Sequence, residues 1–221
     1  YNIKMKESIL IFGSGNQAKV TIDIIELLNV YEIAGIIDNK GSGTSLGYPI
    51  LGTETDLKDI NINKGIISIG NNWLRYQVFK SITNIIPKFN FINAIHPSAV
   101  IANNVEIQDG AQIMAGTVIN SSTIIGSNCI VNTNSSVDHD CIISRYCSIN
   151  PGVALGGHVT LGEFSSIGIG SAVMHNINIG IKTIIGAGSN VVKNIPSNVV
   201  AYGNPCTVRH ASQIDKNGEL K

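Results

Sequence analysis

Apolar residues recur at every sixth position between Ile95 and Val191. Counting in sixes from Ile95, all seventeen positions carry Ile, Leu or Val. With 43% hydrophobic residues in the chain, chance gives such a run with a probability of roughly one in a million for a chosen phase. A helix repeats every 3.6 residues and a strand every two, so neither explains a strict period of six. The pattern predicts short strands bent at regular corners, with one aliphatic side chain pointing inward from each side.

Three such sides close into a coil, and successive coils stack at about 4.8 Å, the ordinary spacing of paired strands. Residues 95–191 then form roughly five and a half coils, a prism about 26 Å long. The fourth residue after each aliphatic position is small or β-branched, as at Thr117 and Cys129. Glycine often follows the aliphatic residue directly, as at Gly126 and Gly168, and we expect it to relax a corner of the coil.

The chain before Ile95 has a different pattern, in which buried-strand signals alternate with amphipathic helical stretches. We predict strands at 8–12, 33–37 and 66–69, a helix after Ala18, a Gly/Ser-rich loop at 41–47 and a second helix at 73–82. Alternating strands and helices predict a small parallel α/β domain, which binds its ligand at the carboxyl ends of the strands.

The first predicted strand runs into Gly13-Ser-Gly-Asn-Gln-Ala18, which opens the helix. A glycine turn of this kind can admit a phosphate to the helix N-terminus. Asp38 lies 23 residues after Gly15, near where a dinucleotide fold places its ribose-binding acid. These features alone leave open an NAD site or a purely structural turn, and the domain is short for a complete dinucleotide fold.

Charge and composition exclude several classes of function. The 221 residues carry 15 basic and 15 acidic side chains, only 14% of the chain is charged, and the pI is about 7.1. We therefore expect no nucleic-acid partner, and the apolar runs are too short for membrane insertion. Three of the four cysteines (Cys129, Cys141 and Cys147) occupy the small inward position of the repeat. We interpret them as buried reduced thiols of a cytoplasmic protein.

The segment Val137-Asp-His-Asp140 holds the candidate catalytic group. By the repeat, His139 points outward, and a neighbouring carboxylate can fix its tautomer and raise its basicity. A solvated surface histidine is the alternative interpretation. One coil of 18 residues after His139 lies Gly157, where a glycine would let a thioester approach the backbone N–H.

The hexad [Ile/Leu/Val]-Gly-x-x-small-x resembles that of hexapeptide-repeat acyltransferases. The N-terminal glycine turn, the strand ending in Asp38-Asn39 and the later Ile69-Gly-Asn-Asn72 resemble, in that order, the sialic acid O-acetyltransferases and bacillosamine-pathway N-acetyltransferases. The resemblance implies a left-handed parallel β-helix over residues 95–211, following a Rossmann-like α/β domain over residues 5–94 that binds a nucleotide-linked sugar. It also implies acetyl-CoA as acetyl donor and a homotrimer with each site between two prisms.

The resemblance assigns site residues as well. On the N-terminal domain it implies substrate contacts from Gly15, Asn16, Gln17, Asp38, Asn39, Asn71 and Arg75. On the prism it implies a general base at His139 with its acid at Asp140, an acetyl-carbonyl donor at Gly157, and further coenzyme A contacts at Ser148, Ile169 and Ala187. The family often carries His at the positions of Gln17 and Ser148. The difference at Gln17 bears on the identity of the sugar, and the difference at Ser148 bears on the contacts with coenzyme A.

These features predict an acetyl-CoA-dependent N-acetyltransferase that acts on a nucleotide-linked 4-amino-sugar in bacterial surface-glycan synthesis. O-acetylation of a sialic or related sugar is the second hypothesis. A non-catalytic β-helix scaffold and a zinc enzyme of the carbonic-anhydrase type are weaker alternatives. His158 and His175 suggest a metal, but His139 and His175 lie two coils, nearly 10 Å, apart, too far to share a zinc with bonds of about 2 Å. We therefore expect no metal cofactor.

Overall fold

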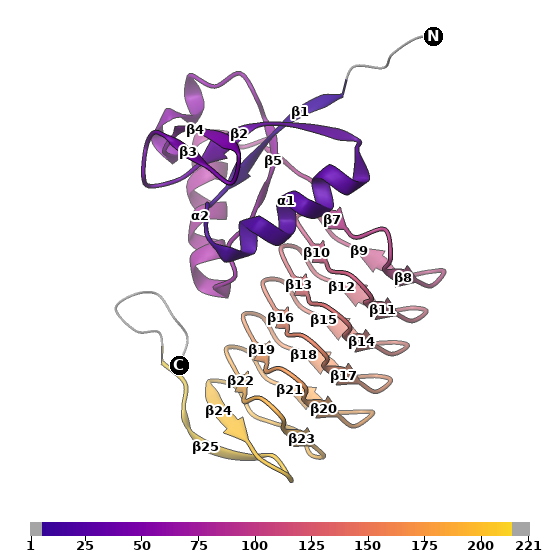
Figure 1. Cartoon of the computed structure of the whole chain (residues 1–221). Helices are drawn as coiled ribbons and strands as arrows, with labels where there is room; N and C mark the ends of the chain where they lie inside the picture. The colour runs from indigo at the N-terminus through magenta and orange to yellow at the C-terminus, as the bar shows by residue number, and fades with distance from the viewer. Residues whose placement is uncertain (1–5, 214–221) are drawn as a thin grey trace.

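The computed structural model describes residues 6–213 and shows an α/β unit joined to a long prism of short parallel strands (Figure 1). The last strand of the α/β sheet, β6, ends at Phe91, and the first prism strand, β7, begins at Ala94. Residue 5, where the predicted N-terminal domain begins, lies outside the described residues. Among those described, no helix has both the length and the apolar character that a membrane crossing requires.

The α/β unit contains the three predicted strands, β1 (Glu7–Phe12), β2 (Tyr31–Ile37) and β5 (Lys64–Ile67), at the centre of a sheet with the order β3-β4-β2-β1-β5-β6. The strands β3 (Thr44–Ser45), β4 (Tyr48–Gly52) and β6 (Asn90–Phe91) complete it. The predicted loop at 41–47 instead contains β3 and the start of the turn that joins β3 to β4. The hairpin is too short to show a hydrophobic period, yet β4 pairs in parallel with β2.

Two helices cover opposite faces of this sheet. Alternate residues of a strand point to opposite faces, so Ile9 and Ile11 join the core beneath α1 (Asn16–Leu28), while Leu10 and Phe12 join the core beneath α2 (Asn72–Ile85). The short 3-10 helix η1 (Glu54–Lys58) packs on the α2 side through the buried Leu57. This layered arrangement leaves the carboxyl ends of β1, β2 and β5 as the open edge of the unit.

The prism confirms the predicted repeat: its strands β7 to β23 each span two residues and end on the predicted aliphatic positions. The eight-stranded sheet comprises β7 (Ala94–Ile95), β10 (Gln112–Ile113), β13 (Ile130–Val131), β16 (Ser148–Ile149), β19 (Ser166–Ile167), β22 (Ile184–Ile185), β24 (Val199–Tyr202) and β25 (Thr207–Ala211). The six-stranded prism sheet comprises β8 (Val100–Ile101), β11 (Val118–Ile119), β14 (Ser136–Val137), β17 (Ala154–Leu155), β20 (Ala172–Val173) and β23 (Asn190–Val191). The five-stranded sheet comprises β9 (Glu106–Ile107), β12 (Ile124–Ile125), β15 (Ile142–Ile143), β18 (Thr160–Leu161) and β21 (Asn178–Ile179).

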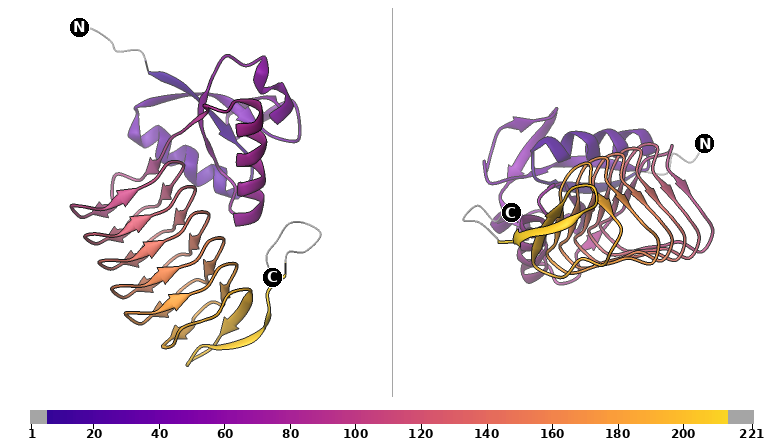
Figure 2. Two further views of the ribbon diagram at one scale, coloured as in Figure 1. Left: turned by 180° about the vertical axis from the view of Figure 1, so that it is seen from behind. Right: turned by 90° about the horizontal axis from the view of Figure 1, so that it is seen from below.

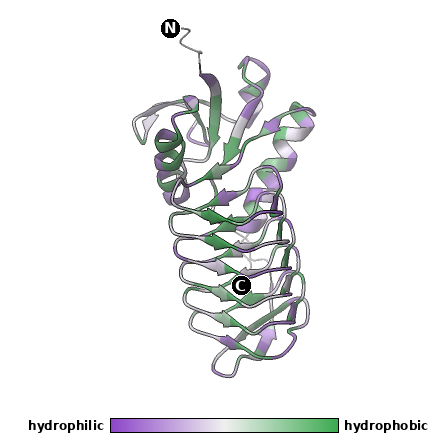
Figure 3. Cartoon of the chain, turned by 90° about the vertical axis from the view of Figure 1, so that its right-hand side faces the viewer, coloured by the Kyte–Doolittle hydropathy of each residue, from purple (hydrophilic) through white to green (hydrophobic). Residues whose placement is uncertain are grey.

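Each strand pairs with the strand 18 residues away, as Ile113 with Val131, so one coil is one turn of a left-handed parallel β-helix. The aliphatic and small inward residues fill a single continuous core, and the strands of one face form apolar rungs (Figure 3). All four cysteines are buried free thiols. The antiparallel hairpin β24–β25 closes the far end of the stack (Figure 2).

The corners follow a different rule from the one we predicted. The glycines that follow the aliphatic residues have ordinary backbone angles. The residues with a positive, left-handed φ stand two positions after these glycines, and they too recur every six residues. Glycine is needed because a side chain would strike the next coil: a Cβ on Gly126 would lie 2.6 Å from the backbone N of Arg145. The coil spacing, rather than corner strain, therefore selects these glycines.

Aromatic side chains fix α2 against one edge of the prism. Tyr146 and Phe164 stack with centroids 5.3 Å apart. On α2, Trp73 packs edge-on against Phe164 and Tyr76 packs edge-on against Tyr146. Tyr146 and Phe164 both have left-handed φ, 59° and 62°, a conformation that costs roughly 1–2 kcal/mol for a non-glycine residue. The aromatic contacts, each worth about 0.5–1.5 kcal/mol, offset that cost and join the two parts of the chain.

Candidate active site

A cavity of about 280 Å³ opens at the carboxyl ends of β1, β2 and β5. Five of the predicted substrate residues line it: Gly15, Asn16, Gln17, Asp38 and Asn39. Ser68, at the end of β5, also lines it, and its buried hydroxyl has no hydrogen-bond partner among the described residues. Sequence reasoning missed Ser68, although its place at the end of a predicted strand was a usable signal.

Asp38 holds the glycine turn in place. Its carboxylate accepts hydrogen bonds from the backbone N–H of Ser14 at 2.9 Å and of Lys40 at 3.1 Å. Partial burial raises the pKa of Asp38, but the hydrogen bonds from Ser14 and Lys40 outweigh it, so the pKa lies below its ordinary value. The carboxylate is therefore ionised at neutral pH and keeps lone pairs for a ligand in the cavity.

Gln17 connects the cavity to the prism. Its Nε2 donates to Oε1 of Gln112 at 2.9 Å, while Nε2 of Gln112 donates to the carbonyl of Ile67. The Ile67 carbonyl can only accept, so it fixes the orientation of both amides. Gln17 thus uses its donor on the prism and leaves its Oε1 as an acceptor. Gln112 is fully buried, a role that its outward strand position did not indicate.

Arg75 and Asn71 do not line this cavity. Arg75 is fully buried, and its five N–H groups donate to the carbonyls of Asn128, Ile69, Gly70 and Cys147 and to Oδ1 of Asn72. Burial lowers the pKa of Arg75 to about 10, so it is still a cation at neutral pH. The expected position of Arg75 in the substrate cleft is wrong: its side chain ties α2 and the end of β5 to the prism.

A second cavity of about 200 Å³ lies between the α/β unit and the eight-stranded sheet, and it shares Gly70 with the first cavity. Asn71 and Ser148, predicted for different ligands, both line it. Ser148 is buried, and its Oγ donates to Oδ1 of Asn72 at 2.6 Å. The structure thus places Ser148 at the junction with the α/β unit.

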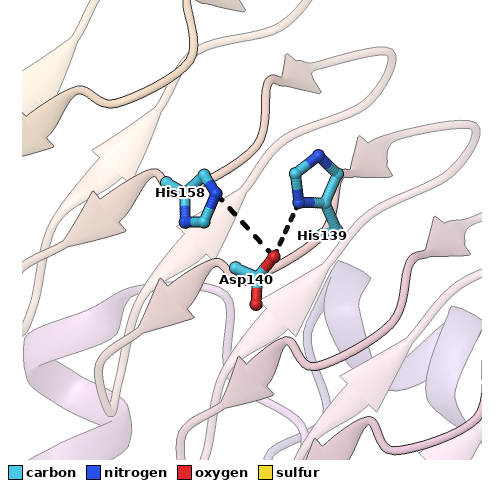
Figure 4. Close-up of side chains that lie close together, drawn as sticks. All are labelled: His139, Asp140 and His158. Carbon is cyan, nitrogen blue, oxygen red and sulfur yellow. Dashed lines mark hydrogen bonds and ion pairs between the residues drawn. The ribbon is translucent and has the colours of Figure 1, made fainter.

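His139 stands on the edge between the six-stranded prism sheet and the five-stranded sheet, just after β14. Nδ1 of its ring lies 2.7 Å from Oδ2 of Asp140 (Figure 4). The hydrogen bond that His139 donates to Asp140 raises the pKa of His139, slight burial opposes it, and the charges of Asp138 and Asp140 add to the rise. The imidazole is about half exposed. This arrangement fixes the proton on Nδ1 and leaves Nε2 with a free lone pair.

Gly157 lies directly beneath this imidazole, as the coil arithmetic predicted. A Cβ there would lie 2.7 Å from Cε1 and 2.8 Å from Nε2 of His139, so glycine is the residue that admits the ring. Sequence reasoning did not join His158 to this group. Its Nε2 lies 3.8 Å from the same oxygen of Asp140, and its ring packs at 90° to that of His139, with centroids 5.2 Å apart.

Ile169 and Ala187 are exposed on a different edge of the prism. They follow β19 and β22 and precede β20 and β23, so they lie between the eight-stranded and six-stranded prism sheets. Ile169 is 60% exposed, and the two residues form one column, as predicted. Within one chain, however, this column and His139 lie on different edges.

Known proteins share these features. Residues 8–82 match the family model of the PglD N-terminal domain. GDP-perosamine N-acetyltransferase from Caulobacter crescentus, as a His-to-Ala variant in complex with CoA and GDP-perosamine, is 33% identical with a TM-score of 0.87, covering 95% of this chain and 99% of that chain. The acetyltransferase domain of PglB from Neisseria gonorrhoeae FA1090, in complex with acetyl coenzyme A, is 29% identical with a TM-score of 0.87, covering 93% and 100%. WeeI from Acinetobacter baumannii AYE is 25% identical with a TM-score of 0.81, covering 91% and 100%. A comparison with curated protein sequences finds no significant match.

The β-helix and its histidine–carboxylate pair define the protein as a hexapeptide-repeat acyltransferase. The relative that is 33% identical over nearly its whole length narrows this class to one family. The chain belongs to the family of bacillosamine- and perosamine-pathway sugar N-acetyltransferases. The family assignment confirms the predicted resemblance and leaves the scaffold and carbonic-anhydrase alternatives without support.

Proposed function

We propose that the protein transfers the acetyl group of acetyl-CoA to the amino group of a nucleotide-linked 4-amino-sugar used for a bacterial surface glycan. The observation that carries this proposal is the His139–Asp140 pair, exposed on the edge of a β-helix whose chain also contains a cavity at the carboxyl ends of an α/β sheet. Relatives solved with CoA and GDP-perosamine, or with acetyl coenzyme A, support the donor and the class of acceptor. Because the relative solved with GDP-perosamine is an N-acetyltransferase, an amine acceptor is favoured over the hydroxyl of a sialic acid.

The chemistry requires a base on the attacking amine. Asp140 holds the Nδ1 proton of His139, so the Nε2 lone pair takes a proton from the amine as it attacks the thioester carbonyl. The charge of Asp140 then stabilises the imidazolium that forms. The backbone N–H of Gly157 has no hydrogen-bond acceptor among the described residues, which supports its proposed role as donor to the acetyl carbonyl.

The cavity of the α/β unit would bind the nucleotide part of the substrate. Its position at the carboxyl ends of parallel strands is the usual ligand site of such sheets. Asn16 at the start of α1 offers a helix N-terminus to the phosphates, and Asp38 and Asn39 lie near the nucleoside. Gln17, which lines this cavity, donates a hydrogen bond to Gln112 of the prism. The α/β unit that would bind the substrate is therefore in direct contact with the prism that carries the proposed base.

A homotrimer would complete the site. The His139 edge and the Ile169 edge border the same sheet on opposite sides, so a closed ring of three prisms brings the two edges of neighbouring chains together. Exposed apolar side chains on these edges and the sheet between them, including Val100, Ile169 and Met174, support such an interface. Coenzyme A would then lie lengthwise between two prisms. A supply of acetyl-CoA and four reduced thiols favour the cytoplasm as the location.

The test is acetyl transfer to GDP-perosamine and other nucleotide-linked 4-amino-sugars, measured as release of the coenzyme A thiol. His139→Asn should bind both ligands and lower kcat about 10²–10⁴-fold, the usual contribution of a general base. The wild-type rate should fall as the pH drops through the raised pKa of His139, and this acid limb should vanish in the variant. His175→Asn, an exposed histidine in the same column, serves as control and should keep the wild-type rate. Near-normal turnover by a folded His139→Asn protein would refute the mechanism.

A further inference from the structure

We propose that His139, Asp140 and His158 also form a binding site for a divalent transition metal ion such as Zn²⁺, and that an ion bound there inactivates the base. The effect on the base rests on the proposed function of His139; the binding itself does not. The geometry is the starting point. Oδ2 of Asp140 lies 2.7 Å from Nδ1 of His139 and 3.8 Å from Nε2 of His158, and the three ligand atoms all lie within 4.8 Å of one another.

These separations are near those of ligands around a tetrahedral ion. Zinc bonds of about 2.0–2.1 Å in tetrahedral geometry place ligand atoms about 3.4 Å apart. The separations of 2.7 and 3.8 Å lie on either side of this value, and the third pair of ligand atoms lies within 4.8 Å. Side-chain rotations that move these atoms by about 0.5–1 Å bring all three to one ion. The three side chains are 46–56% exposed, which gives an ion from solution direct access.

The backbone holds the site ready. Asp140 and His158 are 18 residues apart, occupy the same corner position on neighbouring coils, and have nearly equal φ angles of 57° and 58°. The backbone N–H of His158 donates to the carbonyl of His139 at 3.0 Å, and that of Asp140 donates to Ser121 at 3.1 Å. Because these corners are part of the β-helix ladder, the cost of ordering the ligands has already been met on folding.

The ligand set selects the class of ion. Two imidazoles and one carboxylate suit Zn²⁺, Co²⁺, Ni²⁺ and Cu²⁺, whereas Mg²⁺ and Ca²⁺ prefer sets made only of oxygen. A further negative charge comes from Asp138, which accepts hydrogen bonds from Asn120 and from the backbone N–H of His139. This second carboxylate favours a cation at the corner without competing for a coordination position.

A bound ion would change the tautomer of His139. In the catalytic form Nδ1 carries the proton and Nε2 carries the lone pair. When the metal takes the Nδ1 lone pair, the single proton of the neutral imidazole must reside on Nε2, with no net proton released. His139 then has no lone pair to offer an amine, and Asp140 no longer orients the ring. Metal binding and acetyl transfer are therefore mutually exclusive at this edge.

Isothermal titration of the full chain with ZnCl₂, without acetyl-CoA or sugar, tests the site. We expect one Zn²⁺ per chain in the wild type and no binding of Mg²⁺. His158→Gln should weaken Zn²⁺ binding by more than about tenfold, because loss of even an outer-shell partner typically weakens metal affinity 10–100-fold. His175→Gln should leave it unchanged. Proton–nitrogen NMR correlations of the histidine rings should show the His139 proton moving from Nδ1 to Nε2 as Zn²⁺ is added.

Equal Zn²⁺ affinity in the wild type and His158→Gln, or no binding at millimolar Zn²⁺, would overturn the proposal. Binding that leaves the His139 tautomer unchanged would overturn the inactivation. Neither result would bear on acetyl transfer, because the titration contains no acetyl donor. Conversely, a failed acetyl-transfer assay would leave the metal titration informative.

Discussion

Arg75 offers the sharpest test of how the two parts of the chain are joined. All five N–H groups of its guanidinium are used, on acceptors from the α/β unit and from two coils of the prism. Within residues 6–213 no carboxylate pairs with it, so neutral oxygens compensate the buried charge. Arg75→Met would remove the charge and leave these acceptors unpaired, at a cost of about 1–3 kcal/mol for each acceptor that water cannot reach.

The net effect is smaller than that sum, because burying the charge itself costs several kcal/mol. The cost of the unpaired acceptors, less the relieved cost of burying the charge, leaves a loss of about 3–5 kcal/mol. For a chain of this size, each kcal/mol lowers the melting temperature by roughly 2–4 °C. We therefore expect Arg75→Met to lower it by about 6–20 °C in scanning calorimetry.

Arg75→Lys is the matched comparison. Lysine keeps the charge, but its single nitrogen cannot reach acceptors on both sides of the junction. A buried charge with fewer partners is worse than none, so Arg75→Lys should melt no higher than Arg75→Met. An Arg75→Lys protein that melts close to the wild type would refute this account of the junction. So would an Arg75→Met protein whose melting temperature lies within about 2 °C of that of the wild type.

Three further variants test the site itself. Asp140→Asn should lower kcat less than His139→Asn and move the acid limb of the pH–rate profile to lower pH, because the hydrogen bond that His139 donates to Asp140 is the main cause of its raised pKa. Gly157→Ala should lower kcat with little change in melting temperature, since the new Cβ would displace the imidazole; an unchanged kcat would contradict the packing described. Asp38→Ala should weaken binding of GDP-perosamine by roughly tenfold, which corresponds to the loss of about one hydrogen bond. Calorimetry should find the affinity for coenzyme A unchanged. A parallel loss of both affinities would show that the α/β unit only supports the prism.

The repeat explains why the prism was predictable from sequence. An aliphatic residue at every sixth position has only one way to be buried, and the coil length that follows placed Gly157 under His139 correctly. The same arithmetic joins Asp140 to His158, exactly one coil later, so the signal for the third member of the cluster was present. His175 lies two coils from His139, whereas His158 lies near the same carboxylate, Asp140.

The junction between the parts was not predictable in the same way. A polar residue at an outward strand position, such as Gln112, normally indicates solvent, yet Gln112 is fully buried beneath the α/β unit. The family resemblance implies a substrate contact for Arg75, whereas its side chain is buried against the prism. Which face of that helix meets the prism depends on the docking of two units, and the hydrophobic period of neither one encodes it.

The location of function follows from the same repeat. Inward positions of the β-helix are committed to the core, and the outward positions of the eight-stranded sheet near its start lie beneath the α/β unit, as Gln112 and Ser148 do. Chemistry is therefore left to the exposed edges, where the side chain of a corner residue points to solvent while its backbone is hydrogen-bonded to the neighbouring coil. We propose His139 as the base on one such edge and Ile169 as a coenzyme A contact on another. Since these two edges of one prism face apart, the proposed homotrimer would bring an acyl group held at one edge to the base of a neighbouring chain. We therefore expect separated protomers to lose kcat while each keeps its nucleotide cavity.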